Sequence, residues 1–145
     1  MSGHISEGSV REDLRMCASR LAAALAARIA EVVPDTVQVS AAKSAVTMGT
    51  KESVDATDIE TIVSQSGEFK DNIEAAALLI LSDIQDFIAA RSKSPWPFAS
   101  GEGAGSYLPY PHAEWSNDHL RIFFGEASSP TLELRPITLG ELTQQ

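Results

Sequence analysis

Three antiparallel β-strands are predicted by residues 111–135, which read PHAEWSNDHLRIFFGEASSPTLELR. Apolar and polar residues alternate along this stretch, as they do in strands with one buried face and one solvated face. The pair Asn117-Asp118 separates the first two strands, and both residue types tolerate the left-handed backbone that a two-residue hairpin turn requires. The C-terminal part of the chain is therefore expected to form a three-stranded meander.

This turn determines which residues of the hairpin face each other. Trp115 is expected opposite Leu120 on the buried face, and Glu114 opposite Arg121 on the outer face. The remaining expected pairs are Ala113 with Ile122, Pro111 with Phe124, and His112 with Phe123.

The third strand must place Leu132 and Leu134 on the same buried face, because a slip of one residue would reverse every side chain. One allowed register then sets Glu133 beside Arg121, which would lie between Glu114 and Glu133. Opposite charges paired across strands contribute about 0.2–1 kcal/mol each. Arg121 and Trp115 are expected on opposite faces of the sheet.

A long helix is predicted over about residues 9–33, where apolar residues recur at helical spacing. Ser9 and Glu12 have the spacing of a capping box, in which each side chain bonds the other's backbone N–H. Pro34 disfavours helical backbone in the preceding residue, so this helix is expected to end near Val33. A second helix is predicted over about residues 68–91, with an apolar stripe so broad that its middle should be buried on most sides.

Two short strands are predicted between the helices, one around Val37 and Val39 and one around Val46 and Met48, joined by a turn at Ala41-Ala42-Lys43. Residues 54–63 are compatible with a strand or a short helical turn, and we favour a strand at about 58–63.

The element order helix, two or three strands, helix, three strands predicts an α+β fold. We expect a two-layer sandwich, with the two long helices on one face of one antiparallel sheet. Residues 1–145 are taken as a single domain, with mobile tails at 1–8 and 140–145. Residues 99–106 are rich in glycine and serine and are expected to form a flexible loop. They lack the lysine and the following Ser/Thr of a phosphate-binding loop.

Composition limits the possible partners. The chain has 145 residues, of which 20 are acidic and 11 basic, and its net charge is −9. This charge argues against non-specific nucleic-acid binding and against polybasic attachment to a membrane, and it suits a basic partner. No signal-peptide pattern precedes the first helix, and the longest apolar run, residues 75–81, is far shorter than the roughly 20 residues of a membrane-spanning helix. We expect a cytoplasmic protein.

Residues that could carry chemistry are better explained by structural roles. His112 and His119 share the outer face of the hairpin, but over ~10 Å of strand separates them, too far for one metal ion. Asp83 and Asp86 are expected to form the solvated stripe of the second helix. Cys17, the single cysteine, is expected to be a small buried apolar residue. The sequence therefore predicts no catalytic residue, metal site or cofactor.

Aromatic residues form the strongest candidate site. Trp96, Tyr107 and Tyr110 gather with several prolines around residues 95–111, and Trp and Tyr are favoured in interface hot spots. Phe123 is an apolar residue on the predicted polar face, beside His112, and would be covered by another chain or by its neighbours' side chains. We predict that these five residues form a binding surface. The alternative is that the aromatic cluster is a small satellite core.

Two resemblances bear on function. The segments Pro95-Trp96-Pro97, Pro111 to Glu114, Leu120 to Gly125 and Leu132 to Ile137 resemble those of small uncharacterised proteins from actinobacteria. This resemblance covers the C-terminal third to half of the chain and implies no known activity. In element order, size and acidity the chain is also similar to class I type III secretion chaperones, although a third strand takes the place of their final helix. That likeness implies a small acidic dimer that binds protein.

We predict a non-enzymatic protein–protein interaction module of bacterial origin, with a chaperone, adaptor or immunity role, which binds a protein partner or a second copy of itself. The alternative is a small enzyme or a protein that binds an apolar ligand in a pocket between sheet and helices. The predicted inward positions, such as Ala113 and Ile122, offer almost no polar groups for such a site.

Overall fold

The computed structural model describes residues 7–92, 95–97 and 109–143, with side chains from residue 12 onward. The expected loop at 99–106 and Tyr107 lie outside these residues, as do residues 1–6 of the expected N-terminal tail. The elements follow in the order α1 (Glu7–Ala30), β1 (Gln38–Ala42), β2 (Ala45–Gly49), β3 (Val54–Asp58), α2 (Glu60–Ser64), α3 (Phe69–Ser92), β4 (Pro111–Ser116), β5 (His119–Glu126), β6 (Ser129–Glu133), β7 (Ile137–Thr138) and α4 (Leu139–Thr143).

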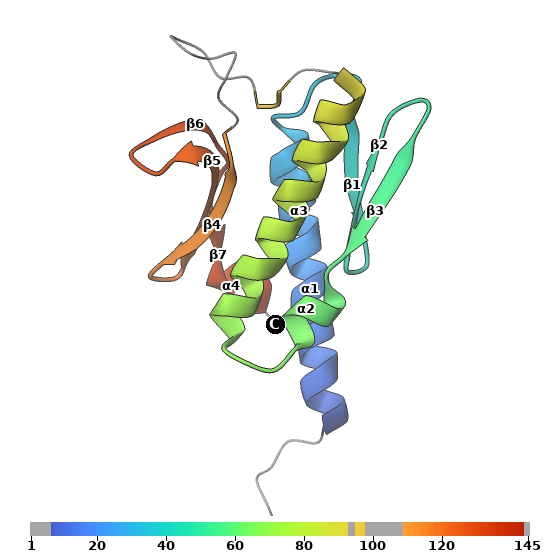
Figure 1. Cartoon of the computed structure of the whole chain (residues 1–145). Helices are drawn as coiled ribbons and strands as arrows, with labels where there is room; N and C mark the ends of the chain where they lie inside the picture. Colours follow the sequence, from blue (N-terminus) through green and yellow to red (C-terminus); the bar gives the residue numbers. More distant parts are fainter. Residues whose placement is uncertain (1–6, 93–94, 98–108, 144–145) are drawn as a thin grey trace, which may run out of the picture.

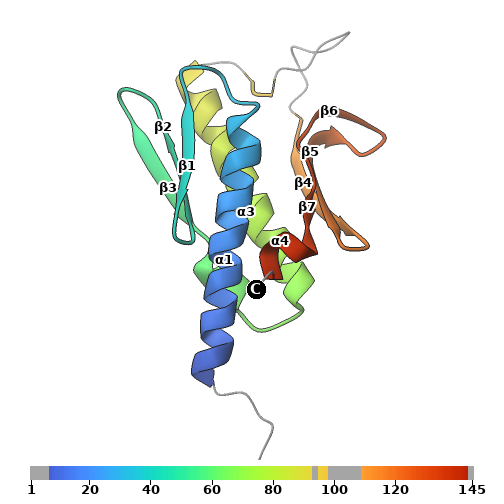
Figure 2. The same ribbon diagram turned by 180° about the vertical axis from the view of Figure 1, so that it is seen from behind.

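Two antiparallel sheets lie on opposite sides of the long helices α1 and α3 (Figures 1 and 2). Sheet A has the strand order β1-β2-β3, and sheet B consists of β4, β5 and β6, with β7 also paired to β5. The helix α1 packs against β1 and β2, whereas α3 packs mainly against β4. The α+β class is confirmed, but the strands form two sheets rather than the single sheet that we expected.

The breadth of the buried surface of α3 explains the second sheet. Buried residues occur on most sides of this helix between Asn72 and Ile88, so a single sheet could not cover them all. The side chains of α1, α3 and both sheets contribute to one apolar core. The helix α3 coincides with the helix predicted at 68–91.

The helix α1 differs from its prediction at both ends. It begins at Glu7, so Ser9 lies inside the helix and is not its N-terminal capping residue. It ends at Ala30, three residues before Val33, although the N–H of Val33 still donates to the carbonyl of Ile29.

Sheet A confirms the two predicted short strands. Their turn consists of Lys43 and Ser44, and Lys43 has a left-handed φ of 55°. The strand expected at 58–63 is wrong: β3 occupies Val54–Asp58, and residues 60–64 form α2. The reason is local, because the Asp58 carboxylate accepts a hydrogen bond from the Glu60 N–H at 2.8 Å and so starts a helical turn.

Sheet B confirms the hairpin register at all five predicted pairs, from Pro111 opposite Phe124 to Trp115 opposite Leu120. Asn117 in the turn has a φ of 56°. The indole N–H of Trp115 donates to the Lys70 carbonyl of α3, so this side chain faces the helices. The alternation of the strand places Arg121 on the other face, as predicted.

The third strand follows a different register from the one predicted. Glu133 lies opposite Phe123, and the pairing shifts between Phe124 and Gly125. Gly125 has a φ of 104°, and an added Cβ would lie 2.8 Å from the backbone nitrogen of Thr131. A bulge that only glycine accommodates therefore bends β5, yet the Glu133 carboxylate still reaches Arg121 diagonally.

The C-terminal segment is folded rather than a tail from residue 140. Leu139–Thr143 form α4, whose Leu142 is fully buried and which packs against α1. Thr138 and Glu141 form a capping box: the Thr138 N–H donates to the Glu141 carboxylate at 2.9 Å, and the Glu141 N–H donates to Thr138 Oγ1 at 3.2 Å. Residues 144–145 lie outside the described residues.

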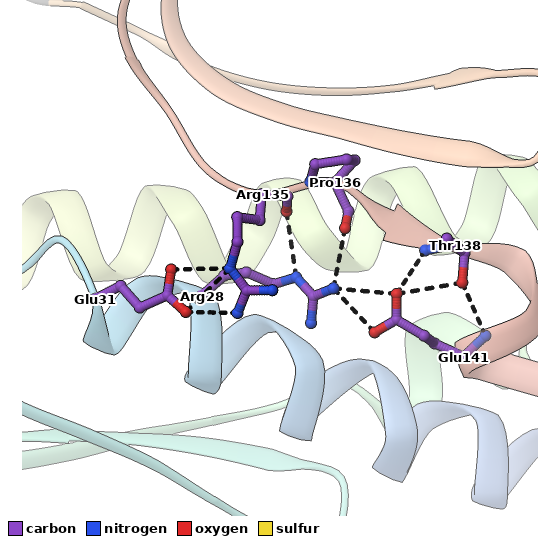
Figure 3. A network of polar contacts seen from close by, with 6 residues as sticks. All are labelled: Arg28, Glu31, Arg135, Pro136, Thr138 and Glu141. Carbon is purple, nitrogen blue, oxygen red and sulfur yellow. Dashed lines mark hydrogen bonds and ion pairs between the residues drawn. The ribbon is translucent and has the colours of Figure 1, made fainter.

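The buried guanidinium of Arg28 joins this segment to α1 (Figure 3). It donates to both carboxylate oxygens of Glu141, at 2.9 and 3.0 Å, and to the carbonyls of Arg135 and Pro136. Arg135 in turn forms an exposed ion pair with Glu31. These contacts hold the end of sheet B and α4 against the first helix.

Candidate interaction face

Three of the five predicted site residues meet on the outer face of sheet B, the face turned away from the helices. Tyr110, His112 and Phe123 line a shallow recess of about 420 Å³ together with residues at the β5–β6 turn. Tyr110 precedes β4, His112 lies within it, and Phe123 lies opposite His112 on β5. We call this surface, which consists of Tyr110, His112, Glu114, Arg121 and Phe123, the aromatic face.

Phe123 is buried on this face by its own neighbours. The His112 ring stacks on the Phe123 ring with centroids 5.0 Å apart and planes at 20°, and the Arg121 guanidinium lies 4.3 Å from its centroid. Only 1% of Phe123 is exposed. Of the two explanations for an outward phenylalanine, cover by neighbouring side chains therefore holds, so a partner on this face would touch His112 and Arg121 rather than Phe123.

Arg121 is held in place by carboxylates on both neighbouring strands. Its Nε lies 2.8 Å from Glu133, and its Nη1 lies 4.0 Å from Glu114. The hydrogen bond to Glu133 raises the pKa of Arg121, and the same bond lowers the pKa of Glu133 below its ordinary value. These ion pairs, which the cross-strand charge pattern predicts, hold the guanidinium over the Phe123 ring.

Trp96 does not belong to the aromatic face. It is 9% exposed and makes an edge-to-face contact with Phe124 on the helix side of sheet B, with ring centroids 5.3 Å apart. Trp96 is therefore a buried residue of the main core rather than of a separate satellite core. Tyr110 behaves in the opposite way and is 65% exposed, although it lies next to buried Pro109.

The other side chains considered for chemistry have structural partners. Asp83 accepts a 2.7 Å hydrogen bond from the Thr57 hydroxyl, and Gln85 donates to the Pro109 carbonyl. Cys17 is buried, and its burial raises the pKa of the thiol. Within the described residues, no group of three or more His, Cys, Asp or Glu side chains is placed to hold a metal ion.

A larger recess, of about 810 Å³, lies where the α1–β1 loop, the start of β1, the β2–β3 loop and the end of α3 meet. Its lining includes Asp35, Lys51, Glu52 and Arg91. Apolar side chains, among them Val37 and Ile88, also line it, so it is a surface recess of mixed charged and apolar character. The inward residues of sheet B, such as Leu120 and Ile122, are packed core.

Sequence reasoning missed two contributors to the aromatic face. Arg121 was expected only as an ion-pair partner, and Glu114 only as its counter-charge. The cross-strand register carried the missing signal, because it already placed both beside His112 and Phe123 on one face.

Comparison with protein families, with curated proteins and with solved structures found no match for this chain. Among the described helices, none has the length and apolarity needed to cross a bilayer.

Proposed function

We propose that this protein is a non-enzymatic protein-binding module, with a chaperone, adaptor or immunity role, and that the aromatic face is its contact surface. The observation that carries this proposal is the exposure of Tyr110 beside the His112–Phe123 stack and the fixed Arg121 guanidinium. Tyrosine and arginine are the residue types that dominate interface hot spots, and rigid side chains lose little entropy on binding.

Charge suits this role. The aromatic face carries acidic Glu114 beside Arg121, with Glu133 on the next strand, and the chain as a whole has a net charge of −9. A basic partner would be attracted at long range and would find carboxylates at the edge of the face. A second copy of the chain is the other occupant that we consider, because a small module can bind through a self-complementary face.

Two experiments test the aromatic face. The first measures molar mass by light scattering over a wide protein concentration range, for the wild type and for Tyr110→Ser. The second places a photo-crosslinking amino acid at position 110 in cells of the source organism. Self-association predicts a dimer that Tyr110→Ser weakens at least tenfold, and a heterologous partner predicts one crosslinked protein at position 110.

The matched control is position 38 on β1, where Gln38 is exposed on the opposite sheet. Gln38→Ser should leave the mass unchanged, and a crosslinker there should capture nothing that position 110 captures. A monomer at every concentration, combined with equal crosslinking at positions 38 and 110, would contradict the proposed function. Unchanged circular dichroism in Tyr110→Ser shows that the fold is retained.

A further inference from the structure

The free edge of β3 is an exposed strand edge on the other side of the molecule from sheet B (Figure 1). Within the described part of the chain, β3 pairs only with β2. Four of its five residues are exposed, and Val54 is 69% exposed. An exposed edge of this kind presents unpaired backbone groups and is a ready template for another strand.

The ladder between β2 and β3 shows which backbone groups are free. The Thr50 N–H donates to the Ser53 carbonyl, and the Ile59 N–H donates to the Ser44 carbonyl. Because bonded pairs alternate along an antiparallel ladder, Asp55 and Thr57 bond to β2. The N–H and C=O groups of Val54, Ala56 and Asp58 therefore point away from β2, towards the free edge.

The strand β3 also forms one wall of an acidic recess. This recess, of about 390 Å³, lies between β3 and α3, and its lining includes three carboxylates, those of Asp55, Asp83 and Asp86, but one cation, Arg91. Arg91 is already engaged, since it lies 3.7 Å from the Phe87 ring centroid and 3.8 Å from Asp55. Asp86 is exposed and has no ion pair or hydrogen bond with any side chain of the described residues.

We propose that the free edge of β3 binds an extended basic segment of a partner protein, which adds to sheet A as a fourth strand. Neighbouring strands lie about 4.8 Å apart, so the added strand would run alongside β3 in front of α3. Every second side chain of the added strand would lie on the face of sheet A that carries Asp55 and Thr57, which is turned towards α3, and would point at Asp86. Backbone pairing supplies the affinity, and lysine or arginine at these inward positions supplies the selectivity.

A second copy of the chain fits this edge poorly. Pairing of two β3 edges would bring two acidic recesses together in a chain of net charge −9, and like charges across strands are destabilising. The acidic residues Asp55 and Asp58 thus discourage self-pairing and favour a basic strand, which is how edge strands are protected and made selective.

The test uses two fluorescent eight-residue peptides as probes, one alternating lysine with valine or threonine and one with glutamate in place of lysine. Binding to the full chain is followed by fluorescence anisotropy at low salt. We expect the lysine peptide to bind at least tenfold more tightly than the glutamate peptide, and added salt to weaken it. Equal binding of the two peptides, or no binding of the lysine peptide up to millimolar concentration, would overturn the proposal.

Substitutions on the edge locate the contact. Ala56→Pro removes an outward N–H without touching the bonds to β2, and should weaken the lysine peptide at least tenfold. Ala41→Pro, at the corresponding position on the outer edge of β1, is the matched control and should have no effect. Asp86→Asn should weaken binding about two- to fivefold, as expected for one exposed ion pair. Asp71→Asn removes the same charge from the start of α3 and should leave binding of the lysine peptide unchanged.

Amide hydrogen exchange supplies a readout that does not depend on any variant. Strand addition predicts that the lysine peptide slows exchange at Ala56 and Asp58, whose N–H groups point outward. Protection confined to sheet B would instead show that the peptide binds the aromatic face and would refute the β3 site. Tyr110→Ser, which tests the aromatic face, should leave peptide binding unchanged.

Discussion

At the residue scale, the contacts of Arg28 are the least predictable feature of the molecule. Its side chain lies near the end of α1, where an arginine normally stays solvated beside the helix C-terminus. Here it is 8% exposed and bonds Glu141, which is more than a hundred residues away. No local sequence pattern indicates such a long-range contact. The spacing of Thr138 and Glu141, in contrast, matches a capping box and could have predicted α4.

The Arg28–Glu141 contact predicts a large effect from a small substitution. Glu141→Gln leaves a buried guanidinium without its carboxylate and should lower the free energy of unfolding by about 1–3 kcal/mol. Glu31→Gln removes the exposed partner of Arg135 and should cost under about 1 kcal/mol. Urea unfolding of both variants measures the difference, and equal effects would show that burial of Arg28 adds nothing.

The same carboxylate predicts a dependence of stability on pH. Burial raises the pKa of Glu141, but the Thr138 N–H and the Arg28 guanidinium outweigh it, so the pKa lies below its ordinary value of 4.5. The unfolded chain then binds the proton more readily, and stability is lost as pH falls below about 4.5. Thermal unfolding between pH 7 and 3 should show a smaller decrease in Glu141→Gln than in the wild type, because this variant no longer titrates at position 141.

At the element scale, the two tight hairpins of the fold use different residues for the same backbone conformation. Lys43 and Asn117 both have a φ near 55°, a region that costs most side chains about 1 kcal/mol and asparagine less. Lys43→Asn should therefore stabilise the protein by about 0.5–1 kcal/mol, and Asn117→Lys should destabilise it by a similar amount. Chemical denaturation of both variants tests this, and a loss of stability in Lys43→Asn would contradict the explanation.

The hairpin of β4 and β5 could be predicted to the residue because two independent signals agree there. Side-chain alternation defines the faces, and the Asn117-Asp118 turn defines the pairing. Around β3 these signals conflict. Val54, Ile59 and Val63 fit neither strand nor helix over the whole segment, and a hydrogen bond from Glu60 to Asp58 decides where the strand ends. The bulge at Gly125 likewise changes the pairing, so that Glu133 lies opposite Phe123, which side-chain alternation alone does not reveal.

At the scale of the whole molecule, the two sheets should differ in stability. The central strand β5 has four consecutive buried residues, Ile122 to Gly125, whereas β3 is exposed along most of its length. Amides of β5 are therefore expected to exchange hydrogen only on global unfolding, and outward amides of β3 through local opening, at least a hundredfold faster. Native-state hydrogen exchange measures both, and equal protection in β3 and β5 would refute a separate, looser edge.

The number of sheets could not be read from the sequence. Each strand pattern predicts a buried face, but it does not say which helix face covers it. The breadth of the apolar surface on α3 was visible, and it required cover on more than one side. The aromatic face, in contrast, could be predicted in part, because His112 and Phe123 follow directly from the hairpin register. Trp96 was misplaced because a loop residue has no periodicity to show its direction.

The stack over Phe123 protects this protein against aggregation. Ile122, Phe123 and Phe124 are consecutive, β-prone and uncharged, the composition of segments that assemble into cross-β fibrils. The core covers Ile122 and Phe124, whereas the His112 ring and the Arg121 guanidinium lie against the outward ring of Phe123. His112 and Arg121 act as gatekeeper residues, because removing the imidazole ring or the guanidinium would expose the Phe123 ring and favour the growth of fibrils from this strand.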